Sequence, residues 1–123
     1  LADESVFTPR DALRIMQERA ADMVNIKLMK CGGITNALRI ASAAEVYGVE
    51  CMMGCMLESK VGITAAASLS GGCSSITKND LDAADLMAAD PVHGGITYDK
   101  NELLLPETPG LGITGIDGIM TLI

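Results

Sequence analysis

Short apolar runs recur along the chain at an even spacing. They begin near Met23, Val49 and Ser75, and helical patterns fill the intervals between them. Strand, helix and strand at so short a period require parallel strands joined by right-handed crossovers. The repeat therefore predicts an α/β fold, and both an open flavodoxin-like sheet and a closed (β/α)8 barrel satisfy it. No phosphate-binding glycine fingerprint follows any run, which disfavours a nucleotide-binding open sheet.

The helical patterns carry recognisable start and stop signals. Thr8 is expected as an N-cap and Pro9 as the first helical residue, with Leu13, Met16 and Ala20 on one apolar face. Further on, "SKVGITAAASLSGG" is a weaker, alanine-rich helix that ends at paired glycines.

The pattern "GITNALRIASAAEVYG" predicts the longest helix. It places Ile34, Leu38 and Ala41 on a stripe and stops at Gly48, a residue typical of the C-terminal cap.

Composition restricts the core and the partners. Hydrophobic residues make up 49% of the 123 residues and aromatic residues 2%, so the core must consist of Ala, Leu, Ile, Val and Met. The mean hydropathy of +0.32 suits a parallel sheet that is buried on both faces. A formal charge of −7 without a basic patch predicts no nucleic acid partner and no membrane partner. The uncharged run 61–77 is interrupted by Gly and Ser and does not read as a membrane span.

The cysteines do not form a metal-binding pattern. Cys31, Cys51, Cys55 and Cys73 contain no pair with C-x-x-C spacing, and His93 is the single histidine. A zinc site is therefore not expected, and His93 is expected to lie on the surface without a chemical role. Reduced thiols and an N-terminus without the basic region of a signal peptide predict a cytoplasmic protein.

The repeat ends shortly after Asp85. "GGITYDKNELLLP" predicts a hairpin in which Ile96 and Tyr98 face the run 103–105, and "PETPGLGITGIDG" is too rich in Pro and Gly for a helix. We therefore divide the chain into a barrel part, residues 1–89, and a tail, residues 90–123, that packs elsewhere.

Polar residues lie near the expected C-terminal ends of the strands. In a barrel these ends gather at one mouth, where the chemistry takes place. The residues are Asp3, Glu4, Lys27, Lys30, Glu58, Asp80 and Asp82.

Lys27 is the main candidate for chemistry. It lies in an apolar run, on the face opposite Val24, Ile26 and Leu28. One interpretation is a solvated surface lysine. Another is a general base whose pKa is lowered by a nearby cation and partial burial, and a third is a Schiff-base lysine in an unrelated barrel lyase. Lys30 has no such support and is expected to be a surface or loop residue.

The carboxylates also allow two interpretations each. Asp80 and Asp82 are two residues apart, so in an extended segment they face the same way and form either a site for an ammonium group or a solvated turn. Asp3 is an oxygen donor of the kind that Mg²⁺ prefers, or else a carboxylate at the entry to the helix near Thr8. Met56 lies nearest its strand end and is expected to line a pocket.

Several motifs together resemble a known family. "ADES", "NIKLMKCGGITNALRIA", "CMLES", "DLDAADL" and "PGLGI" resemble the C-terminal part of the enolase superfamily, in its muconate-lactonizing subgroup. The similarity is greatest to the dipeptide epimerases of the L-Ala-D/L-Glu type, and it covers roughly residues 1–118.

The resemblance implies a fold and a cofactor. The fold is a modified (β/α)8 barrel with an N-terminal capping domain. This chain would supply the end of strand five through strand eight, and its C-terminal tail would return to the capping domain. The family implies an essential Mg²⁺ held by three carboxylates, of which Asp3 matches the third.

The resemblance also implies roles for single residues. Lys27 matches the acid/base lysine of the sixth strand. Met56 and Glu58 match residues of the seventh strand that line the substrate pocket. Asp80 and Asp82 match an Asp-x-Asp pair that receives the α-ammonium of a dipeptide.

Large parts of the family pattern are absent. The capping domain, strands one to four, two metal ligands and an opposing lysine pair have no counterpart. We therefore expect the chain alone to be inactive and to associate with itself or with a missing barrel half. A non-catalytic fragment, a cycloisomerase, an o-succinylbenzoate synthase and an N-acylamino acid racemase remain alternatives.

Overall fold

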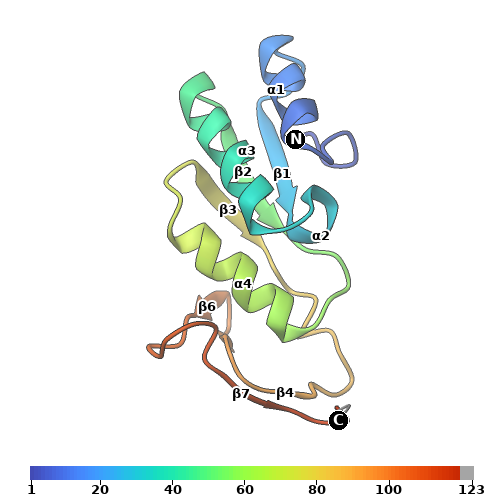
Figure 1. Ribbon diagram of the computed structural model, residues 1–123, viewed down its shortest axis with the longest axis vertical. Coiled ribbons are helices and arrows are strands. Elements are labelled where there is room, and N and C mark those ends of the chain that lie inside the picture. Colours follow the sequence, from blue (N-terminus) through green and yellow to red (C-terminus); the bar gives the residue numbers. More distant parts are fainter. Residues whose placement is uncertain (120–123) are drawn as a thin grey trace.

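The computed structural model describes residues 1–119, in which helices separate the first three strands before the tail begins, with two helices in succession between the first and second strands (Figure 1). Their bounds are α1 (Pro9–Gln17), β1 (Met23–Lys27), α2 (Leu28–Cys31), α3 (Ile34–Tyr47), β2 (Glu50–Gly54), α4 (Lys60–Gly71), β3 (Ile76–Asp80), β4 (Val92–Gly94), β5 (Thr97–Asp99), β6 (Glu102–Leu104) and β7 (Ile113–Ile116). The predicted α/β class is confirmed, and the three repeated strands begin within one residue of their expected positions.

β1, β2 and β3 form a parallel sheet in that order. Met23 pairs with Glu50 and Lys27 with Gly54, so the first two strands begin and end in step. Gly54 in turn pairs with Asp80 across a register shift near the start of β2. On the outer side of β1, Ala2 forms an isolated parallel bridge with Val24. The carboxyl ends of all three strands therefore meet at one edge.

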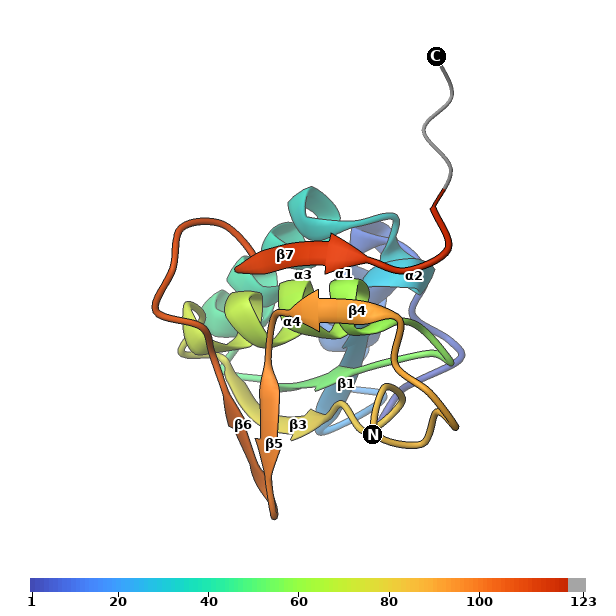
Figure 2. The ribbon, with the colours of Figure 1, turned by 90° about the horizontal axis from the view of Figure 1, so that it is seen from below.

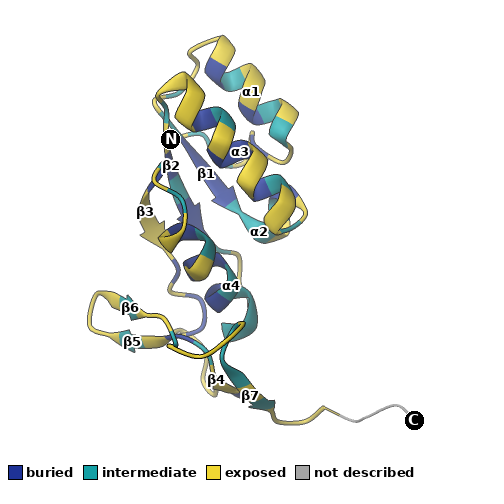
Figure 3. Cartoon of the chain, turned by 60° about the vertical axis from the view of Figure 1, so that its left-hand side comes forward, coloured by how far each residue is buried: buried dark blue, intermediate teal, exposed yellow. Residues whose placement is uncertain are grey.

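The helices cover one side of the sheet, and their inner faces are buried while their outer faces are exposed (Figure 3). Ile26 and Met53 from the strands and Ile40 and Ile63 from the helices are among the largest fully buried side chains. The core thus lies between the sheet and α1, α3 and α4, as in one sector of an α/β barrel.

α1 begins as its sequence predicts. The Thr8 hydroxyl accepts a hydrogen bond from the Asp11 backbone N–H, and the Asp11 carboxylate accepts one from the Thr8 N–H at 2.8 Å. This reciprocal capping box satisfies two backbone donors that a helix start leaves free. The expected apolar face is only partly correct, since Met16 is buried but Leu13 is exposed.

α3 ends at Gly48 as predicted, but its core face differs from the expected stripe. Ile34 and Leu38 are exposed, and only Ala41 of the stripe is buried. The buried face is formed by Ala37, Ile40, Ala41 and Ala44. Alanines let a helix approach a sheet closely, so small residues define this interface rather than the largest apolar ones.

The tail forms two antiparallel pairs, β4 with β7 and the predicted hairpin of β5 with β6 (Figure 2). Tyr98 lies opposite Leu103, as the sequence predicts. The start of the hairpin packs on the barrel part. Ile96 is 2% exposed within the main core cluster, and its N–H donates to the Thr64 hydroxyl of α4 at 3.1 Å.

Candidate active site

The strand register brings two of the predicted site residues onto one face. Lys27 is the partner of Gly54, and Gly54 is the partner of Asp80. Partners in a parallel sheet point to the same side, so Lys27 and Asp80 flank a residue that has no side chain. Gly54 itself places no side chain between Lys27 and Asp80, and the Asn25 amide from β1 lies against it.

Lys27 is paired with Asp3 at the end of β1. Its Nζ lies 3.0 Å from Asp3 Oδ2, and its side chain is only 13% exposed. The hydrogen bond to Asp3 raises the pKa of Lys27. Burial lowers this pKa, but its effect is smaller than that of the hydrogen bond. The expected lowering is therefore not found within residues 1–119, and here Lys27 holds its proton.

Lys30 is not the surface residue that the sequence suggested. Its side chain is 3% exposed, its Nζ donates to the Asp3 backbone carbonyl at 2.6 Å, and it also pairs with the Asp3 carboxylate. The ammonium lies over the Phe7 ring, 5.8 Å from its centroid. The cause is α2, a single helical turn that starts directly after Lys27 and ends at Gly32, where φ is +81°. This turn directs Lys30 back onto the site.

Asp3 is thus held by two lysines. Burial opposes its ionisation, but hydrogen bonds from Lys30 and then Lys27 outweigh burial and lower the pKa of Asp3. The alternative role at the helix entry is taken by Asp11, the actual partner of Thr8.

The Mg²⁺ site that the sequence led us to expect needs several ligands close together. Within residues 1–119 no group of three or more His, Cys, Asp or Glu side chains is placed to hold a metal ion. Asp3 offers one carboxylate of the hard type that Mg²⁺ prefers. No further His, Cys, Asp or Glu side chains are grouped with Asp3 as a ligand set within these residues.

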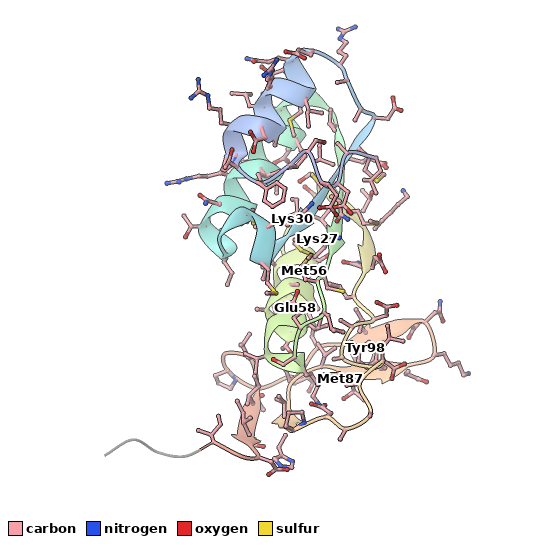
Figure 4. All side chains as sticks on the ribbon, turned by 90° about the vertical axis from the view of Figure 1, so that its right-hand side faces the viewer. Lys27, Lys30, Met56, Glu58, Met87 and Tyr98 are labelled. Carbon is pink, nitrogen blue, oxygen red and sulfur yellow. The ribbon has the colours of Figure 1, made fainter. Side chains whose placement is uncertain are left out.

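The segment after β2 carries Met56 and Glu58, which lie below the two lysines in Figure 4. Met56 is exposed, and its N–H donates to Glu58 Oε1 at 3.1 Å. The other carboxylate oxygen lies against Gly62 in the first turn of α4, where a Cβ would overlap it. Glu58 therefore stabilises this loop and the positive end of α4. Its role and that of Met56 as substrate contacts stay predictions.

Asp80 and Asp82 are both exposed, while Leu81 between them is buried. Neither carboxylate belongs to an ion pair within the described residues, so both are open to a cationic ligand. They line a cavity of about 210 Å³ together with hairpin residues that include Tyr98. Sequence reasoning did not bring the hairpin to this site.

Asn25 is a further residue that the sequence did not single out. It lies two residues before Lys27 on the same face, is 2% exposed, and its Oδ1 has no hydrogen-bond partner within residues 1–119. The sequence signal was an amide residue in an otherwise apolar run, two positions before the candidate base and therefore on the same strand face.

Lys27 and Asp80 thus lie at the carboxyl ends of parallel strands, with Asp82 just beyond, which is where α/β barrels carry their functional residues. A family model described as enolase C-terminal domain-like matches residues 1–117. The chain therefore belongs to the enolase C-terminal domain-like family.

Individual relatives agree with the family. The chain is 57% identical over 117 residues to the L-Ala-D/L-Glu epimerase of Clostridium acetobutylicum, a match that covers 95% of this chain and 33% of that protein. It is 52% identical over 115 residues to the L-Ala-D/L-Glu epimerase of Bacillus subtilis, covering 94% of this chain and 31% of that protein. The chain thus spans about a third of the length of the curated relatives it matches, their C-terminal part.

Solved structures show the same similarity. The substrate-liganded L-Ala-D/L-Glu epimerase from Bacillus subtilis superposes with a TM-score of 0.92 over 94% of this chain and 32% of that one, at 52% identity. The dipeptide epimerase of Enterococcus faecalis, complexed with Mg and L-Leu-L-Tyr, gives a TM-score of 0.88 at 49% identity over 92% of this chain and 32% of that one.

Proposed function

We propose that this chain is the C-terminal part of a Mg²⁺-dependent dipeptide epimerase of the L-Ala-D/L-Glu type. The bridge from Ala2 to Val24 would be the end of barrel strand five, and β1, β2 and β3 would be strands six to eight. The tail, residues 90–123, would return to a capping domain. The observation that carries the proposal is the placement of Lys27 and Asp80 on either side of Gly54.

Lys27 would move the proton at the carbon next to the substrate carboxylate. As a neutral amine, its Nζ takes that proton while the electron pair of the C–H bond passes into the carboxylate. A protonated group on the opposite face, from outside this chain, then donates its proton to the carbon and inverts the centre, which leaves Lys27 protonated and the opposing group neutral. Lys27 must first lose the proton that Asp3 stabilises here.

Asp80 and Asp82 would bind the N-terminal ammonium of the dipeptide. Both are exposed and unpaired within the described residues, and together they contribute two carboxylates to the lining of the cavity. A cycloisomerase, an o-succinylbenzoate synthase or an N-acylamino acid racemase handles substrates without a free ammonium, so this pair favours an epimerase.

Asp3 would be one of the Mg²⁺ ligands of the complete enzyme. When bound, the metal would stabilise negative charge on the substrate carboxylate. Lys30 and Lys27 would hold the Asp3 carboxylate at the strand end. Because the remaining ligands and the second base lie outside this chain, the chain alone would be inactive. Its open strand edges would pair with the rest of the barrel or with a second copy.

The test uses the complete protein in which this chain follows the earlier barrel strands. Dipeptides with a free N-terminus, beginning with L-Ala-L-Glu, are incubated in D₂O, and α-deuterium incorporation is followed by mass spectrometry. We expect incorporation with inversion, and a much lower kcat/KM for the N-acetylated dipeptide. Equal kcat/KM for the two forms would refute ammonium recognition, and no exchange with any dipeptide would refute the epimerase.

A further inference from the structure

The segment that carries Asp80 and Asp82 has few ties of its own. β3 ends at Asp80, and the chain then forms a turn in which the N–H groups of Asp85 and Leu86 donate to the Asp82 carbonyl at 2.9 and 3.2 Å. Neither the Asp80 nor the Asp82 side chain forms a hydrogen bond or ion pair within residues 1–119. The positions of these two carboxylates therefore depend on the backbone between them.

That backbone is held by a residue from the tail. The Tyr98 hydroxyl donates to the Leu81 carbonyl at 2.7 Å, and Leu81 lies directly between the two aspartates. The contact joins residues far apart in the sequence, and it reaches the barrel mouth from β5. The Leu81 side chain is buried beside it, so the linked residue cannot swing out into solvent.

Tyr98 is itself held in place from two sides. It pairs with Leu103 across the hairpin, and the nearby Ile96 N–H donates to the buried Thr64 hydroxyl. Thr64 belongs to α4 and also donates to the Lys60 carbonyl at 2.7 Å. The hairpin is thus attached to a barrel helix, which gives the tyrosine a rigid base.

The protonation state of Tyr98 suits a donor. Burial raises its pKa, and the neighbouring negative charges of Asp85 and Asp82 raise it further. The phenol therefore keeps its proton at neutral pH and donates to the Leu81 carbonyl.

We infer that Tyr98 is a positioning residue that holds Asp80 and Asp82 in place for the substrate ammonium. The inference rests on the proposed function of the two carboxylates. It assigns the tail a direct part in substrate selection, because the hairpin fixes the peptide unit between the two charges.

The test compares Tyr98→Phe with Tyr47→Phe in the complete protein. Phenylalanine keeps the ring and removes only the donor, and Tyr47 is the other tyrosine of the chain, exposed at the end of α3. For Tyr98→Phe we expect KM of a free dipeptide to rise about three- to tenfold, the size of one net hydrogen bond, with kcat within about twofold. The kcat/KM ratio of the free over the N-acetylated dipeptide should fall by a similar factor. Tyr47→Phe should change neither.

A second readout does not depend on activity. Hydrogen–deuterium exchange in a peptide covering residues 81–87 should become faster in Tyr98→Phe, while exchange in α1 should not change. A changed substrate ratio with faster exchange supports the inference. An unchanged ratio overturns it, and so does a loss of kcat that is equal for both substrates. If the unmutated protein epimerises no dipeptide, the proposed function fails, and unchanged exchange at 81–87 would separately show that Tyr98 does not hold the segment.

Discussion

The side-chain amide of Asn25 lies directly against the α-carbon of Gly54 on the neighbouring strand. A Cβ placed on Gly54 would lie 2.9 Å from Asn25 Nδ2 and closer still to Oδ1. Gly54 is also the register partner of Lys27, so this contact lies beside the candidate base. Glycine is required here because the Asn25 amide fills the volume that any other side chain would occupy.

Gly54→Ala should therefore destabilise the protein by about 1–3 kcal/mol, the usual cost of overpacking a core. Asn25 is almost fully buried, so its amide cannot relieve the overlap by moving into solvent without exposing the core around it. Urea unfolding followed by circular dichroism measures the loss.

Gly71→Ala is the matched control for this substitution. Its new Cβ would meet only Leu105 Cδ1 at 3.5 Å, and it lies at the end of α4. It should be neutral or stabilising by up to about 1 kcal/mol. The double variant Asn25→Ala with Gly54→Ala should recover stability relative to Gly54→Ala alone. If it does not, the amide is not the cause of the clash.

Lys27→Ala in the complete protein should abolish epimerisation and leave dipeptide binding within a few-fold of the unmutated protein. A general base acts in the transition state, whereas the carboxylates hold the ground state. Calorimetric titration measures binding, and circular dichroism of the substrate measures turnover.

Lys78→Ala is the control for the loss of a lysine. Lys78 on β3 forms an exposed ion pair with Glu50 on β2, with Nζ 3.3 Å from Oε2. Removal of this lysine should leave the rate of epimerisation unchanged. Turnover of Lys27→Ala at the unmutated rate would show that another residue is the base.

Much of this arrangement follows from local sequence signals. The even spacing of the apolar runs predicted β1, β2 and β3, and Thr8 and Gly48 predicted helix ends, because strand period and capping act over a few residues. The even offset from Asp80 to Asp82 predicts one shared direction only for an extended segment, whereas β3 ends at Asp80 and Asp82 lies in the following turn region, so their common orientation stays a prediction.

Other features depend on contacts that no local pattern contains. Lys30 was missed because its run alternates like a strand, whereas the chain turns into α2 directly after Lys27. The approach of Tyr98 to Leu81 is set by the packing of the hairpin on α4. Such long-range contacts are decided by tertiary structure, and composition and periodicity do not encode them.

Lys30→Met should destabilise the protein by about 2–3 kcal/mol. Methionine keeps an unbranched side chain of nearly the same length but leaves the Asp3 carbonyl and part of its carboxylate without a donor at a half-buried site. Lys78→Met, at an exposed pair, should cost less than about 1 kcal/mol. Thermal unfolding of both variants measures the difference, and equal midpoints would show that the buried pair contributes no more than the exposed one.

The Lys60–Asp90 pair, between α4 and the start of the tail, should make stability depend on pH in the acid range. Burial opposes ionisation of Asp90, but the hydrogen bonds from Lys60 and from the Val92 N–H favour the ionised carboxylate and outweigh burial. The charges of Lys60 and of the nearby His93 also favour it. The pKa of Asp90 therefore lies below its ordinary value of 3.8. A lowered carboxyl pKa contributes stability that is fully present above 3.8 and is lost as pH falls through the folded-state value.

Asp90→Asn isolates this contribution. The difference in unfolding free energy between the unmutated protein and the variant should be larger at about pH 5 than at lower pH, and it should shrink below about pH 4. Urea unfolding at each pH measures it, and the subtraction removes the parallel effect of other carboxylates such as Asp11, whose pKa is also lowered by its bonds to Thr8. A difference that persists unchanged at pH 2.5 would show that the charge of Asp90 does not stabilise the junction between α4 and the tail.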